Sequence, residues 1–136
     1  MRGGNVEIER IDHIVLTVSD VEETVRFYSE VLGMRAVTFA EGRRALAFGG
    51  QKINLHQAGR EFEPKAARPA PGSADFCLIT MTPLGEVMDR LAAGGVEVLQ
   101  GPVEKTGALG PMQSVYIRDP DGNLVEISRY PDGPGR

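Results

Sequence analysis

The two halves of this chain carry the same order of predicted elements, and this repetition constrains the fold more than any other feature. A shift of 62 residues places Leu16 on Leu78, Val25 on Val87 and Gly33 on Gly95. Identity between the halves is low, but the order of apolar and turn residues is kept. The sequence therefore predicts a duplicated supersecondary unit.

A stretch rich in Pro, Gly and charged residues, from residue 58 to residue 73, separates the halves. It has neither a helical nor a strand period, so we interpret it as a linker. The predicted organisation is an N-terminal extension (1–10), a first module (11–57), the linker (58–73), a second module (74–130) and a tail (131–136). Together the two modules form one domain over residues 9–130.

The first half predicts one strand, one helix and three further strands. Residues 11–18 alternate in polarity as a strand does. Ser19 and Glu22 form a capping-box pattern that predicts a helix start, and Gly33 marks its end. Short strands are expected at 34–40, 44–49 and 52–57.

The second half repeats this order. A strand is expected at 75–80, a helix from Thr82-Pro83, and strands at 96–99, 114–118 and 124–129. The last two strands are joined by a strong turn signal, Asp119-Pro120-Asp121-Gly122-Asn123. Residues 107–111 fit either a mobile lid or a plain hairpin connection. The order βαβββ, present twice, predicts an α+β fold.

Composition excludes several classes of function. The formal charge of −4 argues against a nucleic-acid or membrane-surface partner, since both need a concentrated basic face. No apolar run reaches the roughly 18–20 residues of a membrane span, and the N-terminus lacks the apolar core of a signal peptide. Cys77 is the only cysteine, so neither an intrachain disulfide nor a thiolate metal cluster can form. We expect a cytoplasmic protein.

Motifs for phosphate binding, a nucleophile elbow or an HExxH zinc site are absent. The side chains that could bind a metal ion or take part in catalysis are His13, His56, Asp75 and Glu126. They lie in the first and last predicted strands of the two modules. Strand alternation places all four on the sheet face that the helices leave uncovered. If the two sheets curve into one cup, imidazoles and carboxylates converge inside it.

Three segments of the sequence resemble the vicinal oxygen chelate superfamily. They are IDHIVL at residue 11, FYSEVLGM at residue 27 and VYIRDPDGNLVEI at residue 115. That superfamily includes glyoxalase I, fosfomycin-resistance thiol transferases, extradiol dioxygenases and bleomycin-resistance proteins. The resemblance covers about residues 9–130 and is strongest to small single-domain glyoxalase-domain proteins. It implies two tandem βαβββ modules that form a cup-shaped mixed β-sheet with the helices on the outer face.

The resemblance also implies a divalent metal ion, held by the first and last strands of each module. Carried over residue by residue, it assigns His13, His56 and Glu126 as ligands. Asp75 departs from the pattern, because many metal-binding members have His there, so a fourth ligand stays open. The metal could be Zn, Ni, Co, Mn or Fe(II).

The number of ligands decides which reaction such a site can support. Four ligands leave two octahedral positions for a substrate with adjacent oxygens, which fits a glyoxalase-like lyase or isomerase with Glu126 as the catalytic proton carrier. Three ligands leave room for a catechol and dioxygen, which fits an extradiol-type dioxygenase. A thiol transferase is a further alternative.

A bleomycin-resistance-like binding protein is the non-enzyme alternative. It would need aromatic surfaces for flat ligands, whereas Trp is absent and aromatic residues make up 6% of the chain. We also expect a homodimer, because two modules leave sheet edges uncovered; the site could lie within one chain or be shared. By alternation with Val115 and Ile117 in the cup, Tyr116 is expected on the helix side. Cys77 is expected in the cup as a small buried apolar group.

Overall fold

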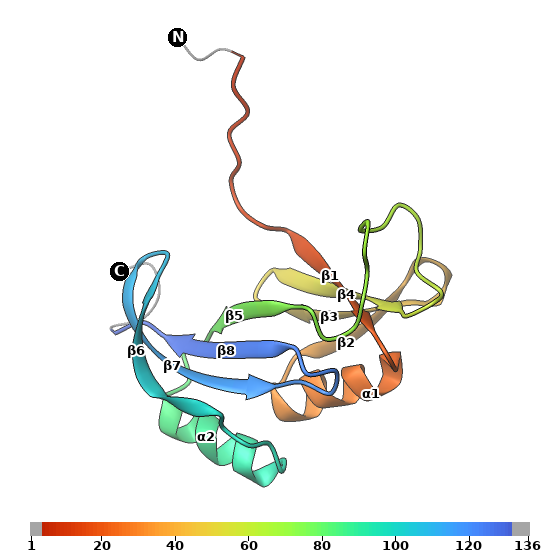
Figure 1. The fold of residues 1–136 in the computed structure, drawn as a ribbon. Coiled ribbons are helices and arrows are strands. Elements are labelled where there is room, and N and C mark those ends of the chain that lie inside the picture. The colour runs from red at the N-terminus through yellow and green to blue at the C-terminus, as the bar shows by residue number, and fades with distance from the viewer. Residues whose placement is uncertain (1–3, 132–136) are drawn as a thin grey trace.

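The computed structural model describes residues 4–131, which form two four-stranded sheets and two α-helices (Figure 1). The elements of the first half are β1 (His13–Val18), α1 (Val21–Arg26), a π-helical turn (Phe27–Val31), β2 (Arg35–Phe39), a 3₁₀ turn (Ala40–Gly42), β3 (Arg43–Phe48) and β4 (Gln51–Gln57). Those of the second half are β5 (Asp75–Ile79), α2 (Leu84–Ala93), β6 (Gln100–Gly107), β7 (Gly110–Arg118) and β8 (Leu124–Arg129). The predicted α+β fold of two tandem modules is confirmed.

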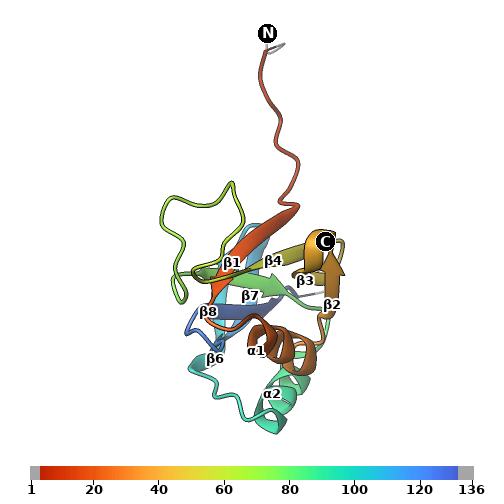
Figure 2. The ribbon, with the colours of Figure 1, turned by 90° about the vertical axis from the view of Figure 1, so that its right-hand side faces the viewer.

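The two sheets have the same topology. The first has the strand order β1-β4-β3-β2 and the second β5-β8-β7-β6. In each, the first and last strands of the module pair in parallel, and the other pairs are antiparallel. Both α1 and α2 lie beneath the sheets in the two views of Figures 1 and 2. We call the sheet face opposite the helices the open face.

Alternating apolar residues turn the helix-side face of both sheets into one core. Leu16 and Val18 of β1 are 4% and 0% exposed, and Val125 and Ile127 of β8 are equally well covered. They join Leu91 of α2 and residues of α1 in a single buried cluster. Because this cluster takes side chains from both modules, burial of apolar surface holds the two halves together.

The Asp119–Asn123 turn, which the sequence marks strongly, anchors one module to the other. The Tyr28 hydroxyl donates to Asp119 Oδ2 at 2.7 Å, and Asn123 Nδ2 donates to the same oxygen at 2.8 Å. Asn123 Oδ1 in turn accepts from the Ala74 backbone N–H at 2.8 Å. Burial first, and then the negative charge of Asp119, raises the pKa of Tyr28 well above its usual value, so this phenol stays a donor.

Two local predictions need correction, and the structure decides between two alternatives for a third segment. The helix α1 is capped by Asp20, whose Oδ1 accepts from the Glu23 N–H at 3.0 Å, not by Ser19. The second strand of the second module runs over Gln100–Gly107, not 96–99. Of the lid and the hairpin connection considered for residues 107–111, the structure has the hairpin, a tight one between β6 and β7 in which Gly107 pairs with Gly110.

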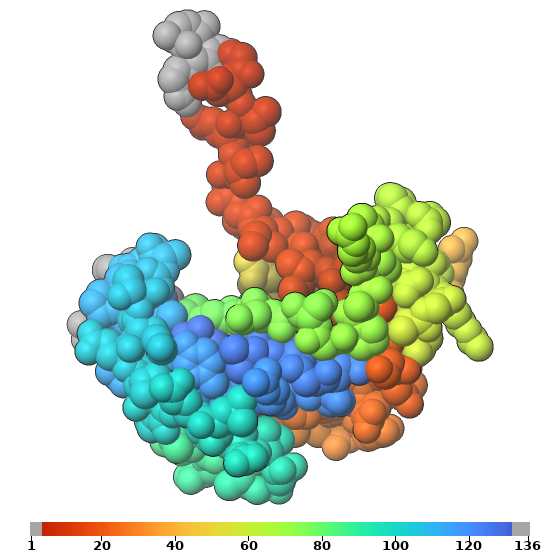
Figure 3. All heavy atoms as spheres, in the orientation of Figure 1, coloured from red at the N-terminus to blue at the C-terminus, as the bar shows by residue number. Residues whose placement is uncertain are grey.

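Two segments project from the sheets. Residues 5–12, which we call the arm, form neither helix nor strand and rise away from the body (Figures 1 and 3). Val6 and Ile8 of the arm are 81% and 83% exposed. The linker 58–73 arches above the end of the first sheet, and Figure 3 shows a hollow between it and the β6–β7 hairpin. None of the helices within residues 4–131 is long and apolar enough to cross a membrane.

Candidate functional site

Glu126 lies at the centre of a polar cluster on the open face of the second sheet. Its neighbours across the sheet are Cys77 on β5 and Tyr116 on β7. Glu126 Oε2 accepts a 2.7 Å hydrogen bond from Ser114 Oγ and a longer one, 3.3 Å, from Ser128 Oγ. The two serine hydroxyls are 2.6 Å apart and fully buried, so one oxygen of the carboxylate is held in a fixed position.

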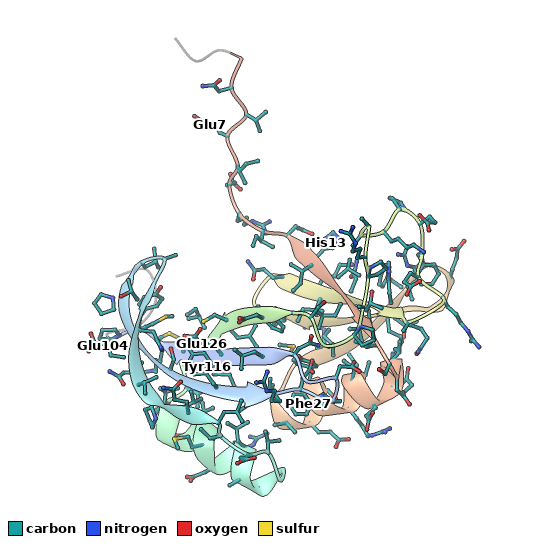
Figure 4. The ribbon with its side chains drawn as sticks, in the orientation of Figure 1. Glu7, His13, Phe27, Glu104, Tyr116 and Glu126 are labelled. Carbon is teal, nitrogen blue, oxygen red and sulfur yellow. The ribbon has the colours of Figure 1, made fainter. Side chains whose placement is uncertain are left out.

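Tyr116 belongs to this cluster, contrary to the sequence prediction. Val115 and Ile117 are both 0% exposed in the core, and alternation then turns Tyr116 to the open face. Figure 4 shows Tyr116 beside Glu126. Burial, followed by the negative charge of Glu126 and a hydrogen bond to it, raises the pKa of the Tyr116 phenol. Tyr116 is therefore a neutral proton donor next to the carboxylate.

Cys77 also lies on the open face, as predicted, but the residue as a whole is exposed and only its thiol is partly covered. Its Sγ is 3.1 Å from Ser128 Oγ. Burial of the thiol group raises its pKa, and the charge of Glu126 acts in the same direction. The thiol is therefore poorly disposed to ionise, and we assign it no nucleophilic role.

In the first module, the candidate site residue at the start of β1 is His13. Its Nδ1 lies 2.8 Å from Asp12 Oδ2, and its side chain is 42% exposed. Hydrogen bonding to His13 lowers the pKa of Asp12, so this carboxylate is ionised. A carboxylate on Nδ1 leaves Nε2 as the ring nitrogen that can bind a metal ion or a ligand.

The strand register identifies Asn54 as the counterpart of Glu126 in the first module. Val15 pairs with Asn54, and its repeat partner Cys77 pairs with Glu126. Asn54 Oδ1 is buried, and no residue in the described part of the chain donates a hydrogen bond to it. A buried amide oxygen without a donor is costly, so Asn54 is a polar group of this face whose hydrogen-bonding capacity is not met within residues 4–131.

His56 lies further along the same face. It pairs with Thr17, four residues beyond His13 on β1, which separates the two backbones by about 13 Å. The His56 residue is 4% exposed, and its ring packs edge-on against Phe62 of the linker at 5.5 Å. Burial, and then the charge of Arg43, lowers the pKa of His56, so the ring is neutral at pH 7. This spacing argues against His13 and His56 binding the same ion.

Asp75 is exposed at the start of β5, at the position that repeats His13. Asp75 pairs with Leu124, which precedes Glu126 by two residues on β8. Asp75 and Glu126 are therefore diagonal neighbours on the open face. The predicted place of Asp75 on this face is correct in the structure. Asp75 and Glu126 together supply two carboxylates at one end of the second sheet.

One chain alone does not assemble the predicted ligand set. Among residues 4–131, no three His, Cys, Asp or Glu side chains are grouped closely enough to bind a metal ion. Figure 4 shows the reason: His13 and Glu126 lie on different sheets and at a distance from each other. The structure therefore does not support the alternative in which the whole site lies within one chain.

The individual groups nevertheless fit a divalent ion. His13 offers an oriented Nε2, Glu126 a carboxylate held by two serines, and Asn54 an amide oxygen without a donor. Imidazole and oxygen donors of this kind suit Zn, Mn, Fe(II) and related metals. Carboxylate and hydroxyl partners that orient the ligands are also usual around protein metal sites.

Sequence reasoning missed Asn54, Tyr116 and Ser114. Alternation in β7 would have found the last two, had Val115 and Ile117 been assigned to the core. Asn54 was hidden because the spacing from the first to the last strand differs between the modules, so the shift of 62 residues does not map Asn54 onto Glu126. Only the strand pairing shows that the two are equivalent.

Comparison with known proteins identifies relatives along almost the whole chain. The sequence profile of the Glyoxalase/Bleomycin resistance protein/Dioxygenase superfamily matches residues 10–127. Virulence protein STM3117 of Salmonella typhimurium is 63% identical over 123 residues, covering 90% of this chain and 85% of that protein. Glyoxalase domain-containing protein RDO1 of Mycosarcoma maydis is 49% identical, covering 93% and 72%. The crystal structure of STM3117 superposes with a TM-score of 0.91 over 93% of this chain and 100% of that one, at 61% identity.

More distant relatives are enzymes of three kinds. A probable lactoylglutathione lyase of Vibrio parahaemolyticus is 27% identical and covers 87% of this chain and 88% of its own. Metallothiol transferase FosB of Shouchella clausii is 27% identical, covering 88% and 80%. Biphenyl-2,3-diol 1,2-dioxygenase 2 of Rhodococcus globerulus is 29% identical, covering 85% and 60%.

Proposed function

Because the chain belongs to the Glyoxalase/Bleomycin resistance protein/Dioxygenase superfamily, we propose that it is a metal-dependent, glyoxalase-like lyase or isomerase whose site is completed by a second copy of the chain. The observation that carries the proposal is the Glu126 cluster, in which Ser114, Ser128 and Tyr116 hold a carboxylate on the open face. A carboxylate fixed in this way, beside a neutral phenol, can take a proton from a substrate and return it.

The separation of His13 from Glu126 supports a shared site. In a symmetric dimer, the first module of one copy can face the second module of the other, and two equivalent sites result. Strands β1 and β5 each lie at the end of their sheet, so each has an edge without a ladder partner in residues 4–131. Val15 of β1 and Ile79 of β5, both on open faces, are 45% and 44% exposed. These edges and side chains are the surface that a second copy would cover.

The arm adds a second surface for the same partner. Its residues alternate between apolar and charged as a strand does, with Val6 and Ile8 on one side and Glu7 and Glu9 on the other. It runs directly into β1, whose open edge belongs to the shared site. An extended segment of this length reaches about 25 Å from the body, far enough to lie on a second copy.

In the proposed site, His13 and Asn54 of one copy and Asp75 and Glu126 of the other would hold a divalent ion. When bound, the ion supplies a Lewis acid that binds two adjacent oxygens of a substrate and makes a neighbouring C–H more acidic. Glu126 then serves as the base that moves the proton. Ser114 and Ser128 keep its position, and Tyr116 donates a hydrogen bond toward it.

The position of His56 favours one of the alternatives. An extradiol-type dioxygenase would need two imidazoles and one carboxylate on one ion. His13 and His56 are about 13 Å apart along their strands, so the chain offers only one histidine to the shared site. A lyase or isomerase with one imidazole and several oxygen ligands is therefore favoured over a dioxygenase. The polar cluster around Glu126 likewise favours an enzyme over a metal-free binding protein.

Metal analysis tests the proposal. We expect the purified dimer to bind Mn²⁺, Ni²⁺ or Zn²⁺ at one ion per chain, measured by elemental analysis after loading and dialysis. Glu126→Gln is expected to lower the affinity at least about tenfold, because the ion loses a charged ligand. Glu104→Gln, an exposed carboxylate on β6 (Figure 4), is the matched control and should bind metal as the wild type does. Failure of the wild type to bind any of these ions would exclude the metalloenzyme.

A further inference from the structure

A cavity of about 580 Å³ lies beneath the linker, against the open face of β1 and β4. Its walls come from Val15 and Thr17 of β1, His56 of β4, and linker residues between Pro64 and Ser73. Cavities of a few hundred Å³ are the size of sites for small organic molecules. Since Val15 also belongs to the surface of the proposed shared site, this cavity opens beside that site.

Two residues of the cavity wall, Asn123 and His56, are polar and buried; the Asn123 side chain is bonded to Asp119 and Ala74, which leaves His56. The residue is 4% exposed, yet its ring nitrogens make no hydrogen bond with any residue that the structure describes. The ring contacts Phe62, which offers it no acceptor or donor. A neutral imidazole carries one donor and one acceptor, so a ligand in the cavity can satisfy a group that the protein leaves unsatisfied.

The charged residues that line the cavity are both basic. Lys65 is already paired, with its Nζ 3.2 Å from Glu63 and 3.6 Å from Glu61. Arg68 also lines the cavity, and it forms no ion pair or hydrogen bond with residues 4–131. The remaining linker residues in the wall are apolar, and include Pro64, Ala66 and Pro69, except for Ser73, whose hydroxyl donates to the Ala70 carbonyl. The cavity thus combines one uncommitted guanidinium with an apolar wall.

We propose that this cavity binds a small organic carboxylate, with the carboxylate on Arg68, a hydrogen bond from His56 and the apolar body against the linker. A single free guanidinium matches a single carboxylate in charge and in its two-pronged geometry. The inference rests on the proposed function in one respect only, which is that the bound acid is the substrate or part of it. Binding itself needs neither the metal nor Glu126.

Calorimetric titration with benzoate tests the charge recognition, with neutral benzamide as its near-isosteric control. We expect benzoate to bind the wild type, benzamide to bind much more weakly, and Arg68→Gln to weaken benzoate binding about tenfold. Arg60→Gln is the control, because it removes the same charge from the same linker at a residue that does not line this cavity. The Arg60→Gln variant should bind benzoate with the affinity of the wild type. Equal binding of benzoate and benzamide, or an Arg68→Gln variant that binds like the wild type, overturns the inference.

Histidine side-chain NMR of the intact protein locates the bound acid. The ring resonances of His56 should shift on addition of benzoate, while those of His13 stay in place. A shift of His13 without one of His56 would place the ligand elsewhere and contradict the proposal. Glu126→Gln separates this inference from the proposed function: it should lose metal but keep benzoate. A protein that binds benzoate at His56 and never binds metal would refute the metalloenzyme alone.

Discussion

At the scale of single residues, the account depends on buried polar groups and on whether each has a partner. Asp119 is 6% exposed, but both of its oxygens accept hydrogen bonds, from Tyr28, from Asn123 and from the backbone of its own turn. Asn54 Oδ1 is also buried and has no such partner among residues 4–131, and the ring nitrogens of the largely covered His56 make no hydrogen bond with those residues. The bonded groups hold the fold, and the proposed ion and ligand would lie at the groups that have no partner within residues 4–131.

Tyr28→Phe tests the structural half of this distinction. The substitution keeps the ring but removes the donor to a buried carboxylate, so we expect a loss of about 1–3 kcal/mol in the free energy of unfolding. Urea denaturation followed by circular dichroism measures it. Tyr116→Phe removes a hydroxyl from the open face and should cost less than about 0.5 kcal/mol. Equal free energies of unfolding for the two variants would show that the Tyr28–Asp119 hydrogen bond does not stabilise the contact between the modules.

At the scale of elements, the N-terminus of α1 shows which of two possible capping residues the helix uses. Both Ser19 and Asp20 can cap a helix, and the structure uses Asp20, whose carboxylate binds the Glu23 N–H. Asp20→Ala should therefore destabilise the protein by about 1 kcal/mol. Ser19→Ala should change the free energy of unfolding by less than about 0.5 kcal/mol, measured in the same way. A larger loss of stability for Ser19→Ala than for Asp20→Ala would show that Ser19 caps the helix, as the capping-box pattern predicts.

Order and type of elements could be predicted from the sequence, because they follow from the period of apolar residues and from turn residues. The hairpin between β7 and β8 is the best case, since Asp119 and Asn123 form the turn as well as signalling it. The strand predicted at 96–99 failed because Val96 and Val98 pack against the core outside the sheet, while β6 begins at Gln100. Pairing of that kind is a tertiary property that local pattern does not contain.

The candidate site could be predicted in part. His13, Asp75 and Glu126 have the open-face orientation that alternation gives them. His56 and Asn54 share that face too, and alternation alone cannot choose between them. The choice needs the register of β1 against β4, which depends on packing across the whole sheet. For the same reason, alternation could not show that His13 and Glu126 lie apart in one chain.

At the scale of the whole molecule, the arm should contribute to dimer stability. Ile8→Ser replaces an apolar side chain that the second copy is expected to cover, so we expect the dimer dissociation constant to rise at least about tenfold. Sedimentation velocity over a dilution series measures this constant. Glu9→Ser, on the opposite side of the arm, is the control and should change it little. An unchanged constant for Ile8→Ser would show that the arm lies outside the dimer interface.

The shared site is the central claim, and mixing two defective variants tests it most directly. His13→Ala and Glu126→Gln should each bind little metal alone. If each site takes His13 from one copy and Glu126 from the other, half of the randomly mixed dimers carry one intact site of two. Unfolding and refolding the variants together should then restore about a quarter of the wild-type metal content, measured by elemental analysis. Tight metal binding by either variant alone, or none in the refolded mixture while the wild-type dimer binds, would contradict the account.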